Sequence, residues 1–509
     1  MRRAAPVVAG AAVVALALSG CVSWFLPPAS STTSTPTNET VDAALEPYYH
    51  QVLEWSTCNG SMQCATAKAP LDWADPGGEQ VELALIRQTA TSGTAQGSLL
   101  INPGGPGGSG YDFIANSIDY ATDERLQASF DVVGFDPRGV NRSTAVKCYD
   151  DPAELDAYLY DIYPGEPGSD EWLAAAARAS TKWGERCLEI TGPLLGHVDT
   201  ASAARDLDML RAALGDETLS YLGYSYGTLL GQVYAELFPD RAGRLVLDGA
   251  VDPAASDFEG TATQAKGFES ALRAFLDDCA TADECPFRGS TNDSMKRIRS
   301  LLDTLDASPL ANDDGRQLGS GAMFTAIILP LYNEANWPSL RDLFTSVFQG
   351  DASYAFQLAD NYNSRNPDGS YRDNQTEAFI AINCLDAHGD GSVDEMRAEA
   401  EQLRQLAPVF GPQMSWGGTG CPNWPVPATR ERLPISAPGS PDILVIGTTN
   451  DPATPYEWAV TVAQTLSQGH LVTYEGEGHT AYNKSNDCVN DTVDDFLIDG
   501  TVPATDPRC

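Results

Sequence analysis

Apolar and polar positions alternate along the chain in a way that predicts strands and helices in turn. Several short runs are compact and apolar or alternate with period two, as buried strands do. Residues 200–215 instead repeat apolar side chains at helical spacing, with Thr200 as a cap and Gly215 as a stop. This order predicts a mostly parallel sheet covered by helices. The candidate strands are residues 81–88, 98–103, 130–139, 219–222 and 244–253.

The strand pattern is interrupted between residues 254 and 434. This segment holds helical stretches, such as 268–280 and 396–406, and no clear buried strand. Strands resume at 442–447 and 470–476, and a last helix follows at 488–498. We therefore expect one core formed by residues 45–253 and 435–509, with a mainly helical insertion at 254–434. An independent C-terminal domain is the alternative, but one or two strands cannot bury a core alone.

A Gly-Tyr-Ser-Tyr-Gly sequence stands between a strand and a helical stripe. Ser225 lies at its centre, and Gly223 and Gly227 occupy the positions two residues away. A strand, G-x-S-x-G and helix in this order form a nucleophile elbow, in which the small neighbours let strand and helix pass. The sequence therefore predicts Ser225 as a nucleophile; a serine that merely occupies a turn is the alternative.

A serine nucleophile needs a base and an orienting carboxylate. Among five histidines, His479 alone follows the last strand, where loops gather at the carboxyl edge of the sheet. Asp451 follows the preceding strand in the same way. The chain order Ser225, Asp451, His479 is that of an α/β-hydrolase. A polar loop histidine and simple turn chemistry at Asp451 are the alternatives.

A glycine-rich loop, residues 102–110 (NPGGPGGSG), follows an early strand. Backbone N–H groups that stabilise an oxyanion come from such a loop and from the residue after the nucleophile. We therefore predict Gly105 and Tyr226 as the two donors. A phosphate-binding loop is the rival interpretation, but the lysine and Ser/Thr of that motif are absent.

Five motifs together resemble the proline iminopeptidase and tripeptidyl aminopeptidase family of α/β-hydrolase serine peptidases, in particular its secreted actinobacterial type with a C-terminal TAP-like region. They are PGGPG, DPRG, GYSYG, DPATP and GEGHT. The similarity spans roughly residues 45–509. It implies an α/β-hydrolase fold with a mainly helical cap inserted after the sixth strand, and removal of short N-terminal units from peptides. Pro103 stands where the family has histidine, and Asn141 stands where it has glycine.

An aminopeptidase must hold the free α-ammonium of its substrate. Carboxylates in the cap could do so by Coulomb attraction in a partly dry pocket. Asp386, two residues after Cys384, and Glu377 are the candidates, with Glu269 and Glu334 as further alternatives. A solvated acidic face is the other interpretation of each.

The N-terminal segment predicts export. Residues 1–20 combine a basic start with an apolar run too short for a bilayer, and the LSGC sequence resembles a lipobox with Cys21 as the lipidated residue. Ordinary cleavage nearby, with Cys21 incidental, is the alternative. Residues 21–44 are rich in Ser, Thr and Pro, and we expect them to form a flexible tether.

Eleven cysteines less Cys21 leave ten, an even number that fits disulfides in an oxidising compartment. The pairs that we expect are Cys58–Cys64, Cys148–Cys187, Cys279–Cys285, Cys384–Cys421 and Cys488–Cys509. No CxxC pair or nearby histidine suggests a metal, so we expect neither metal nor cofactor. A net charge of −39 argues against a nucleic-acid partner.

Together these features predict an exported serine exopeptidase, a monomer that acts on peptides. It would sit at the outer face of the cytoplasmic membrane through its lipid anchor, or in the cell wall or extracellular space. The triad also fits a carboxylesterase, and a catalytically inactive peptide-binding lipoprotein is the third possibility. Epoxide hydrolases and dehalogenases of this fold need an aspartate nucleophile, which Ser225 disfavours.

Overall fold

The computed structural model describes residues 32–387, 389 and 391–509. The expected signal sequence at residues 1–20 and the expected lipidation at Cys21 lie outside the described residues, as does the first part of the expected tether. Within the described residues, no helix combines the length and apolar character that a membrane crossing requires.

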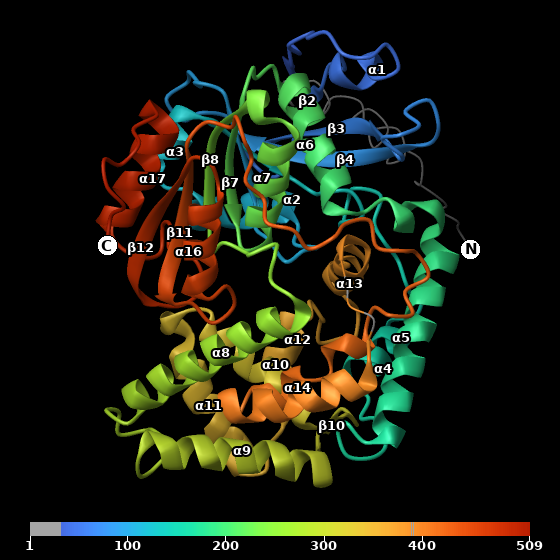
Figure 1. Ribbon diagram of the computed structural model, residues 1–509, viewed down its shortest axis with the longest axis vertical. Coiled ribbons are helices and arrows are strands. Elements are labelled where there is room, and N and C mark those ends of the chain that lie inside the picture. The colour runs from blue at the N-terminus through green and yellow to red at the C-terminus, as the bar shows by residue number, and fades with distance from the viewer. Residues whose placement is uncertain (1–31, 388, 390) are drawn as a thin grey trace, which may run out of the picture.

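A ten-stranded sheet runs through the molecule (Figure 1) in the order β1-β2-β3-β4-β6-β5-β7-β8-β11-β12. The strands from β6 to β12 in this order pair in parallel, whereas β1 to β4 form an antiparallel extension. Strands β4 and β6 join the two parts antiparallel to each other. The strands of this sheet are β1 (Thr32–Thr33), β2 (Glu54–Thr57), β3 (Gln63–Pro70), β4 (Gln80–Gln88), β5 (Ser98–Asn102), β6 (Asp131–Phe135), β7 (Leu219–Tyr224), β8 (Ala242–Asp248), β11 (Ile443–Asn450) and β12 (Gly469–Glu477).

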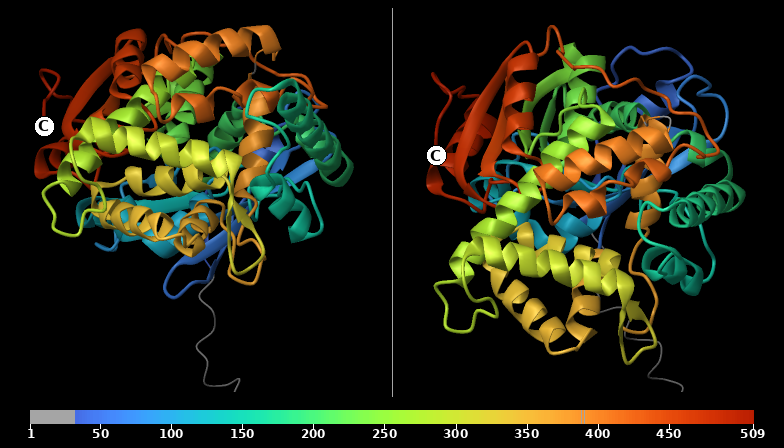
Figure 2. Two further views of the ribbon diagram at one scale, coloured as in Figure 1. Left: turned by 90° about the horizontal axis from the view of Figure 1, so that it is seen from below. Right: turned by 60° about the horizontal axis from the view of Figure 1, so that its bottom comes forward.

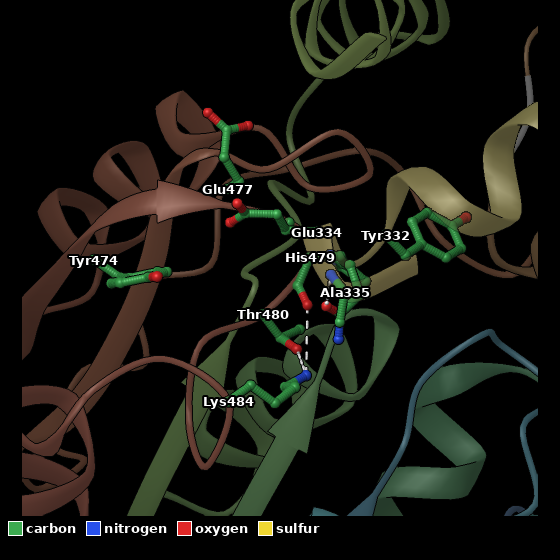
Figure 3. A pocket seen from close by; sticks show the side chains of 10 residues that line it. Tyr332, Glu334, Ala335, Tyr474, Glu477, His479, Thr480 and Lys484 are labelled. Atoms are coloured by element: carbon green, nitrogen blue, oxygen red, sulfur yellow. Dashed lines mark hydrogen bonds between the residues drawn. The ribbon is translucent and has the colours of Figure 1, made fainter. Parts of the chain in front are cut away.

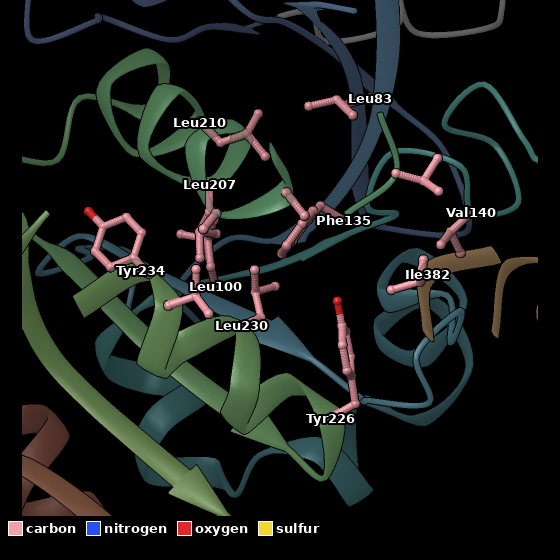
Figure 4. Close-up of a cluster of buried hydrophobic side chains, with 14 of the residues drawn as sticks. Leu83, Leu100, Phe135, Val140, Leu207, Leu210, Tyr226, Leu230, Tyr234 and Ile382 are labelled. Carbon is pink, nitrogen blue, oxygen red and sulfur yellow. The ribbon is translucent and has the colours of Figure 1, made fainter. Parts of the chain in front are cut away.

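Helices cover both faces of the sheet. One face packs against α1, α6, α7 and α16, and the other against α2, α3 and α17. Figure 4 shows Leu207 and Leu210 of α6 and Leu230 of α7 gathered around Leu100 of β5, which is how the helical stripes of the sequence become buried. The bounds are α1 (Glu46–Tyr49), α2 (Gly110–Ala121), α3 (Glu124–Ser129), α6 (Thr200–Leu214), α7 (Tyr226–Leu237), α16 (Tyr456–Thr465) and α17 (Asp487–Asp499).

A helical cap is inserted between β8 and β11 and has a hydrophobic core of its own. Most of its helices lie together at one end of the sheet (Figures 1 and 2), whereas the helix Gln375–Asp386 packs against the core, where Ala378 and Ile382 join the buried cluster. The insertion follows the sixth strand of the sheet when the short β1 and β2 are set aside. Its elements are α8 (Asp257–Cys279), α9 (Thr291–Ala307), β9 (Leu310–Ala311), β10 (Gln317–Leu318), α10 (Ser320–Leu331), α11 (Trp337–Phe348), α12 (Ser353–Tyr362), α13 (Gln375–Asp386), α14 (Val393–Leu406) and α15 (Gly411–Met414).

Two helices between β6 and β7, α4 (Pro152–Tyr160) and α5 (Asp170–Thr191), were not expected from the apolar pattern. They lie beside the cap (Figure 1). Arg365 forms a bidentate ion pair with Asp156 of α4, with both hydrogen bonds at 2.7 Å. The hydroxyl of Tyr160 donates to Asp360 of α12 at 2.8 Å. The cap therefore receives support from a second insertion in the core.

Five disulfides join the described cysteines, and the pairs are those expected from the sequence. They are Cys58–Cys64, Cys148–Cys187, Cys279–Cys285, Cys384–Cys421 and Cys488–Cys509. The bond between Cys384 and Cys421 ties α13 to the segment after α15, across a span that includes α14.

Arg138 of the DPRG motif connects separate segments of the core. Its guanidinium is fully buried and forms an ion pair with Asp206 of α6 through two hydrogen bonds of 2.7 and 2.6 Å. The remaining N–H groups donate to the carbonyls of Leu71, His197 and Pro70 at 2.8 to 3.0 Å. All five donors of the guanidinium thus have acceptors. Burial raises the pKa of Asp206, and Arg138 opposes this shift.

Arg138→Met should lower the free energy of unfolding by about 3–5 kcal/mol, because it leaves the buried Asp206 carboxylate without its partner. Chemical denaturation of the oxidised protein measures this change. Arg404→Met is the matched control, since Arg404 pairs with Glu401 at an exposed site and the substitution should change stability little. A similar small effect for both variants would contradict the role of Arg138.

Candidate functional site

Ser225 occupies a sharp turn between β7 and α7. Its backbone has φ 54° and ψ −123°, a conformation that is unfavourable for a residue other than glycine. A Cβ atom on Gly223 would lie 2.5 Å from the carbonyl oxygen of Gly227, and one on Gly227 would lie 2.9 Å from that of Asn102. The two glycines therefore allow strand and helix to pass, as the sequence motif predicts.

The glycine-rich loop after β5 runs against this turn. A Cβ atom on Gly104 would lie 2.5 Å from the carbonyl oxygen of Tyr224 and 3.1 Å from the amide nitrogen of Tyr226. The Gly104 N–H donates to Asn102 Oδ1 at 2.9 Å, whereas the N–H of Gly105 has no protein acceptor among the described residues. The N–H of Tyr226 begins α7 and has no partner within that helix. The loop that carries Gly105 is thus adjacent to the turn that carries Tyr226.

Asp451 and His479 lie together at the ends of neighbouring strands β11 and β12. His479 Nδ1 is 2.9 and 3.0 Å from the two oxygens of Asp451, which is buried. Asp451 also accepts from the N–H groups of Ala453, Thr454 and Thr480 at 2.8 to 3.2 Å. Its carboxylate is therefore fixed on both oxygens. With Nδ1–H donating to Asp451, the Nε2 atom of His479 is left as the acceptor.

Two cavities of about 410 and 420 Å³ adjoin at His479. Ser225 and His479 both line the first, whose walls include the aromatic residues Phe113, Tyr120 and Tyr224. The second cavity contains two acidic residues, Glu334 of the cap and Glu477 of β12, and is drawn in Figure 3. The remaining residues shared by both cavities are Tyr332, Asn333, Thr480 and Lys484.

The cap contacts His479 and the segment that follows Asp451. The N–H of His479 donates to the carbonyl of Tyr332, at the end of α10, at 2.8 Å, and the two rings lie 5.4 Å apart. On the other side, Gln264 of α8 donates to the carbonyl of Ala453 at 2.7 Å. The cap thus forms part of the frame that holds the histidine and its carboxylate.

The two acids expected to bind the substrate ammonium lie elsewhere. Asp386 accepts from the N–H and hydroxyl of Thr200 at 2.8 and 2.5 Å, and burial raises its pKa to about 6. Burial also raises the pKa of Glu377, to about 7, with the Cys148 amide as a hydrogen-bond partner. Neither lines the two cavities. Both carboxylates serve contacts between the cap and the core instead.

Of the further acidic alternatives, Glu269 is buried in the cap and accepts from the N–H groups of Val409 and Phe410 at 3.0 and 3.3 Å. Glu334 is the one that lines a cavity beside His479.

Several site residues were missed by the sequence analysis because their roles depend on tertiary neighbours, although Thr454 and Glu477 stand within the DPATP and GEGHT motifs. The missed residues are Thr454, which contacts both Asp451 and His479, together with Asp248, Gly249, Tyr332, Glu477 and Lys484. Asn141, which departs from the resembled pattern, has φ 44°, a value that asparagine tolerates better than most residues.

Comparisons with known proteins agree with this geometry. Residues 407–509 match the family model described as TAP-like protein. Over 490 residues the chain is 37% identical to the serine protease Hip1 of Mycobacterium tuberculosis, covering 91% of this chain and 92% of the relative. It is 36% identical over 455 residues to carboxylesterase B of the same organism, with 88% and 86% covered.

A third relative is the tripeptidyl aminopeptidase of Streptomyces lividans, which is 31% identical over 472 residues, with 90% of this chain and 86% of the relative covered. These relatives cover nearly all of both the core and the cap. The chain therefore belongs to the family of α/β-hydrolase serine hydrolases that includes Hip1 and the tripeptidyl aminopeptidases, and it is a hydrolase.

Proposed function

We propose that this protein is a serine exopeptidase that removes short N-terminal units, such as tripeptides or prolyl residues, from peptides through an acyl-enzyme on Ser225. The observation that carries this proposal is the pair of adjoining cavities. One holds Ser225 beside His479, and the other places two carboxylates next to the same histidine.

In the proposed reaction, Ser225 Oγ attacks the scissile carbonyl while its proton passes to His479 Nε2. Asp451 holds the imidazole through Nδ1–H and stabilises the imidazolium that forms. His479 then donates the proton to the leaving amine, and the C–N bond breaks. Water attacks the acyl-enzyme in the second half-reaction, with His479 again as base. The N–H groups of Gly105 and Tyr226 would stabilise the oxyanion, each contributing roughly 10²- to 10³-fold in rate.

The acidic cavity favours an exopeptidase over an endopeptidase. Glu334 and Glu477 lie on one side of His479, and Lys484 lies on the other (Figure 3). Burial raises the pKa of Glu477, and the negative charge of Glu334 raises it further, because the two carboxylates repel each other. A substrate ammonium placed between them would relieve this repulsion. We therefore assign the substrate N-terminus to Glu334 and Glu477.

A carboxylesterase with the same triad is the second candidate function. The aromatic cavity beside Ser225 supports it, because Phe113, Tyr120 and Tyr224 could hold an apolar acyl or alcohol group. An esterase does not need the two acids next to His479, because its substrate need not carry an ammonium group. Dependence of the activity on these acids therefore distinguishes the two candidate functions.

We also propose that the enzyme acts outside the cytoplasm. Five disulfides among the described residues fit an oxidising compartment. Peptides are then its partners, reached from the outer face of the membrane or in the cell wall or medium.

Ser225→Ala should lower kcat on tripeptide arylamides by at least about 10³-fold, because no other group can form the acyl-enzyme. It should also abolish labelling by a fluorophosphonate probe. Wild-type protein that the probe fails to label at neutral pH, beside a control hydrolase that it labels, would favour a peptide-binding protein without catalysis.

Acetylation of the substrate N-terminus should abolish most of the turnover of an arylamide, since it removes the charge that Glu334 and Glu477 would bind. The double variant Glu334→Gln and Glu477→Gln should raise KM for the free-amine substrate roughly 10- to 100-fold, the cost of lost charge-assisted hydrogen bonds. Its activity on the acetylated substrate should not change.

Glu475→Gln is the control for this experiment. Glu475 lies on the same strand, β12, but pairs with Arg508 and does not line either cavity. Equal rates on free and acetylated substrates by the wild-type protein would instead support the esterase.

Gly249→Ala should lower kcat/KM at least about tenfold, through displacement of His479. Gly249 has φ 71°, and a Cβ atom there would lie 2.9 Å from both Thr454 Oγ1 and Thr480 Cγ2 and 3.3 Å from His479 Cε1. The loss corresponds to about 1.4 kcal/mol of transition-state stabilisation. Steady-state kinetics measures it.

Gly350→Ala is the matched control for backbone strain. Gly350 has φ 86°, but its Cβ would meet nothing within 4 Å. That variant should lose about 1 kcal/mol of stability and keep wild-type kinetics. Equal kinetic losses in the two variants would contradict the assigned contact.

A further inference from the structure

Asp248 stands between the two halves of the candidate triad. It ends β8, which pairs with β7 on one side and with β11 on the other. Its backbone carbonyl accepts from the N–H of Ser225 at 2.9 Å. Its side chain accepts from the N–H of Ala481 at 3.0 Å on both oxygens and from that of Tyr482 at 2.8 Å. A single residue thus bonds the backbone of the nucleophile turn and the loop that follows His479.

The loop that Asp248 binds has an unfavourable backbone conformation at several positions. Gly478, Thr480 and Asn483 all have positive φ, at 96°, 64° and 58°. Positive φ at Thr480 and Asn483 costs free energy that surrounding contacts must offset. Asp451 orients the imidazole ring, and the Thr480 N–H is the one backbone group after His479 that it binds. The next two N–H groups along the loop are those that Asp248 binds.

Asp248 also brings a charge close to the histidine, because the next residue, Gly249, lies against the ring: a Cβ atom there would be 3.3 Å from His479 Cε1. The carboxylate is fully buried. Burial raises its pKa, while Lys484, the amides of Tyr482 and Ala481, and His479 act in the opposite direction. Because both oxygens accept N–H groups, the geometry fits the ionised form. Lys484 donates to Thr480 Oγ1 and to the carbonyl of His479, and stacks over Tyr120 and Tyr224.

The charged and titratable groups around His479 come from several elements. Asp451 contacts the ring directly, Asp248 lies behind the loop, and Lys484 follows in the same loop. Glu334 and Glu477 face it across the acidic cavity, and the ring of Tyr332 lies against it from the cap. Asp248 and Lys484 carry opposite charges and bear on the same histidine, so they should have opposite effects on its protonation.

We propose that Asp248 is a positioning residue, which holds the His479 loop against the Ser225 turn and, together with Lys484, sets the charge around the imidazole. Asp248, at the end of β8, thereby connects the turn that follows β7 with the loop that follows β12. The inference rests on the proposed role of His479 as the general base for Ser225.

The test uses the second-order rate of fluorophosphonate labelling of Ser225 as a function of pH, because this reaction needs no peptide. Failure of the exopeptidase assignment would leave it unaffected. Asp248→Asn should lower the maximal labelling rate roughly 10- to 100-fold, since an amide cannot accept N–H bonds on both sides and the loop shifts. It should also move the midpoint of the acid limb to lower pH by about half a unit or more, because loss of a negative charge disfavours the imidazolium.

Lys484→Met should move the same midpoint in the opposite direction, to higher pH, because removal of a positive charge favours the imidazolium. This variant lies in a cavity wall and tests the charge relation even if Asp248→Asn fails to fold. Glu269→Gln is the matched control, a buried carboxylate in the cap that also accepts two backbone N–H groups. It should leave both the rate and the midpoint unchanged.

A lower rate for Asp248→Asn without a shifted midpoint, together with an unshifted midpoint for Lys484→Met, would reduce Asp248 to a structural residue and overturn the proposal. An unchanged labelling rate in folded Asp248→Asn would overturn it as well.

Discussion

The alignment of four parallel strand ends is the constraint on which the rest of this structure depends. Strands β7, β8, β11 and β12 are neighbours in the sheet, so the residues that follow them meet at one edge. Tyr224 pairs with Asp248, and Asp248 with Ile446, in registers that fix the turns beyond. The pairing of the strands, rather than contacts between the site residues themselves, thereby brings residues that are far apart in sequence next to each other. Small glycines at Gly223, Gly227 and Gly249 keep this edge narrow enough for the loops to touch.

Buried carboxylates hold the edge together. Asp248 and Asp451 each lie at or just beyond the end of a strand, and each accepts several backbone N–H groups from the loops. A buried charge is costly unless it is bonded in this way. The same cost makes the arrangement specific, because a loop that moved away would leave a desolvated charge without partners. Asp206 with Arg138 follows the same rule deeper in the core.

The order of strands and helices in the core, the Ser225 turn and the Asp451–His479 contact could be predicted because each depends on local patterns and on chain order. The helices α4 and α5 could not, because no motif marks them and their buried side chains are divided between the core cluster and the cluster of the cap. The assignment of Asp386 and Glu377 to the substrate failed to anticipate their burial, which depends on tertiary partners such as Thr200. Gly249 lies in none of the motifs, and the GEGHT motif points to His479 rather than to Glu477, so the roles of both follow from the residues that the fold places beside them.

In the proposed reaction, the cap would contribute through Tyr332 and Glu334. Glu334 comes from the cap and Glu477 from the core, so the proposed ammonium site exists where the two meet. The carbonyl of Tyr332, two residues before Glu334, accepts the N–H of His479. A shift of this part of the cap would therefore disturb the base and the N-terminal site together. In the proposed reaction, correct placement of a substrate N-terminus and correct placement of the histidine depend on the same short segment of the cap.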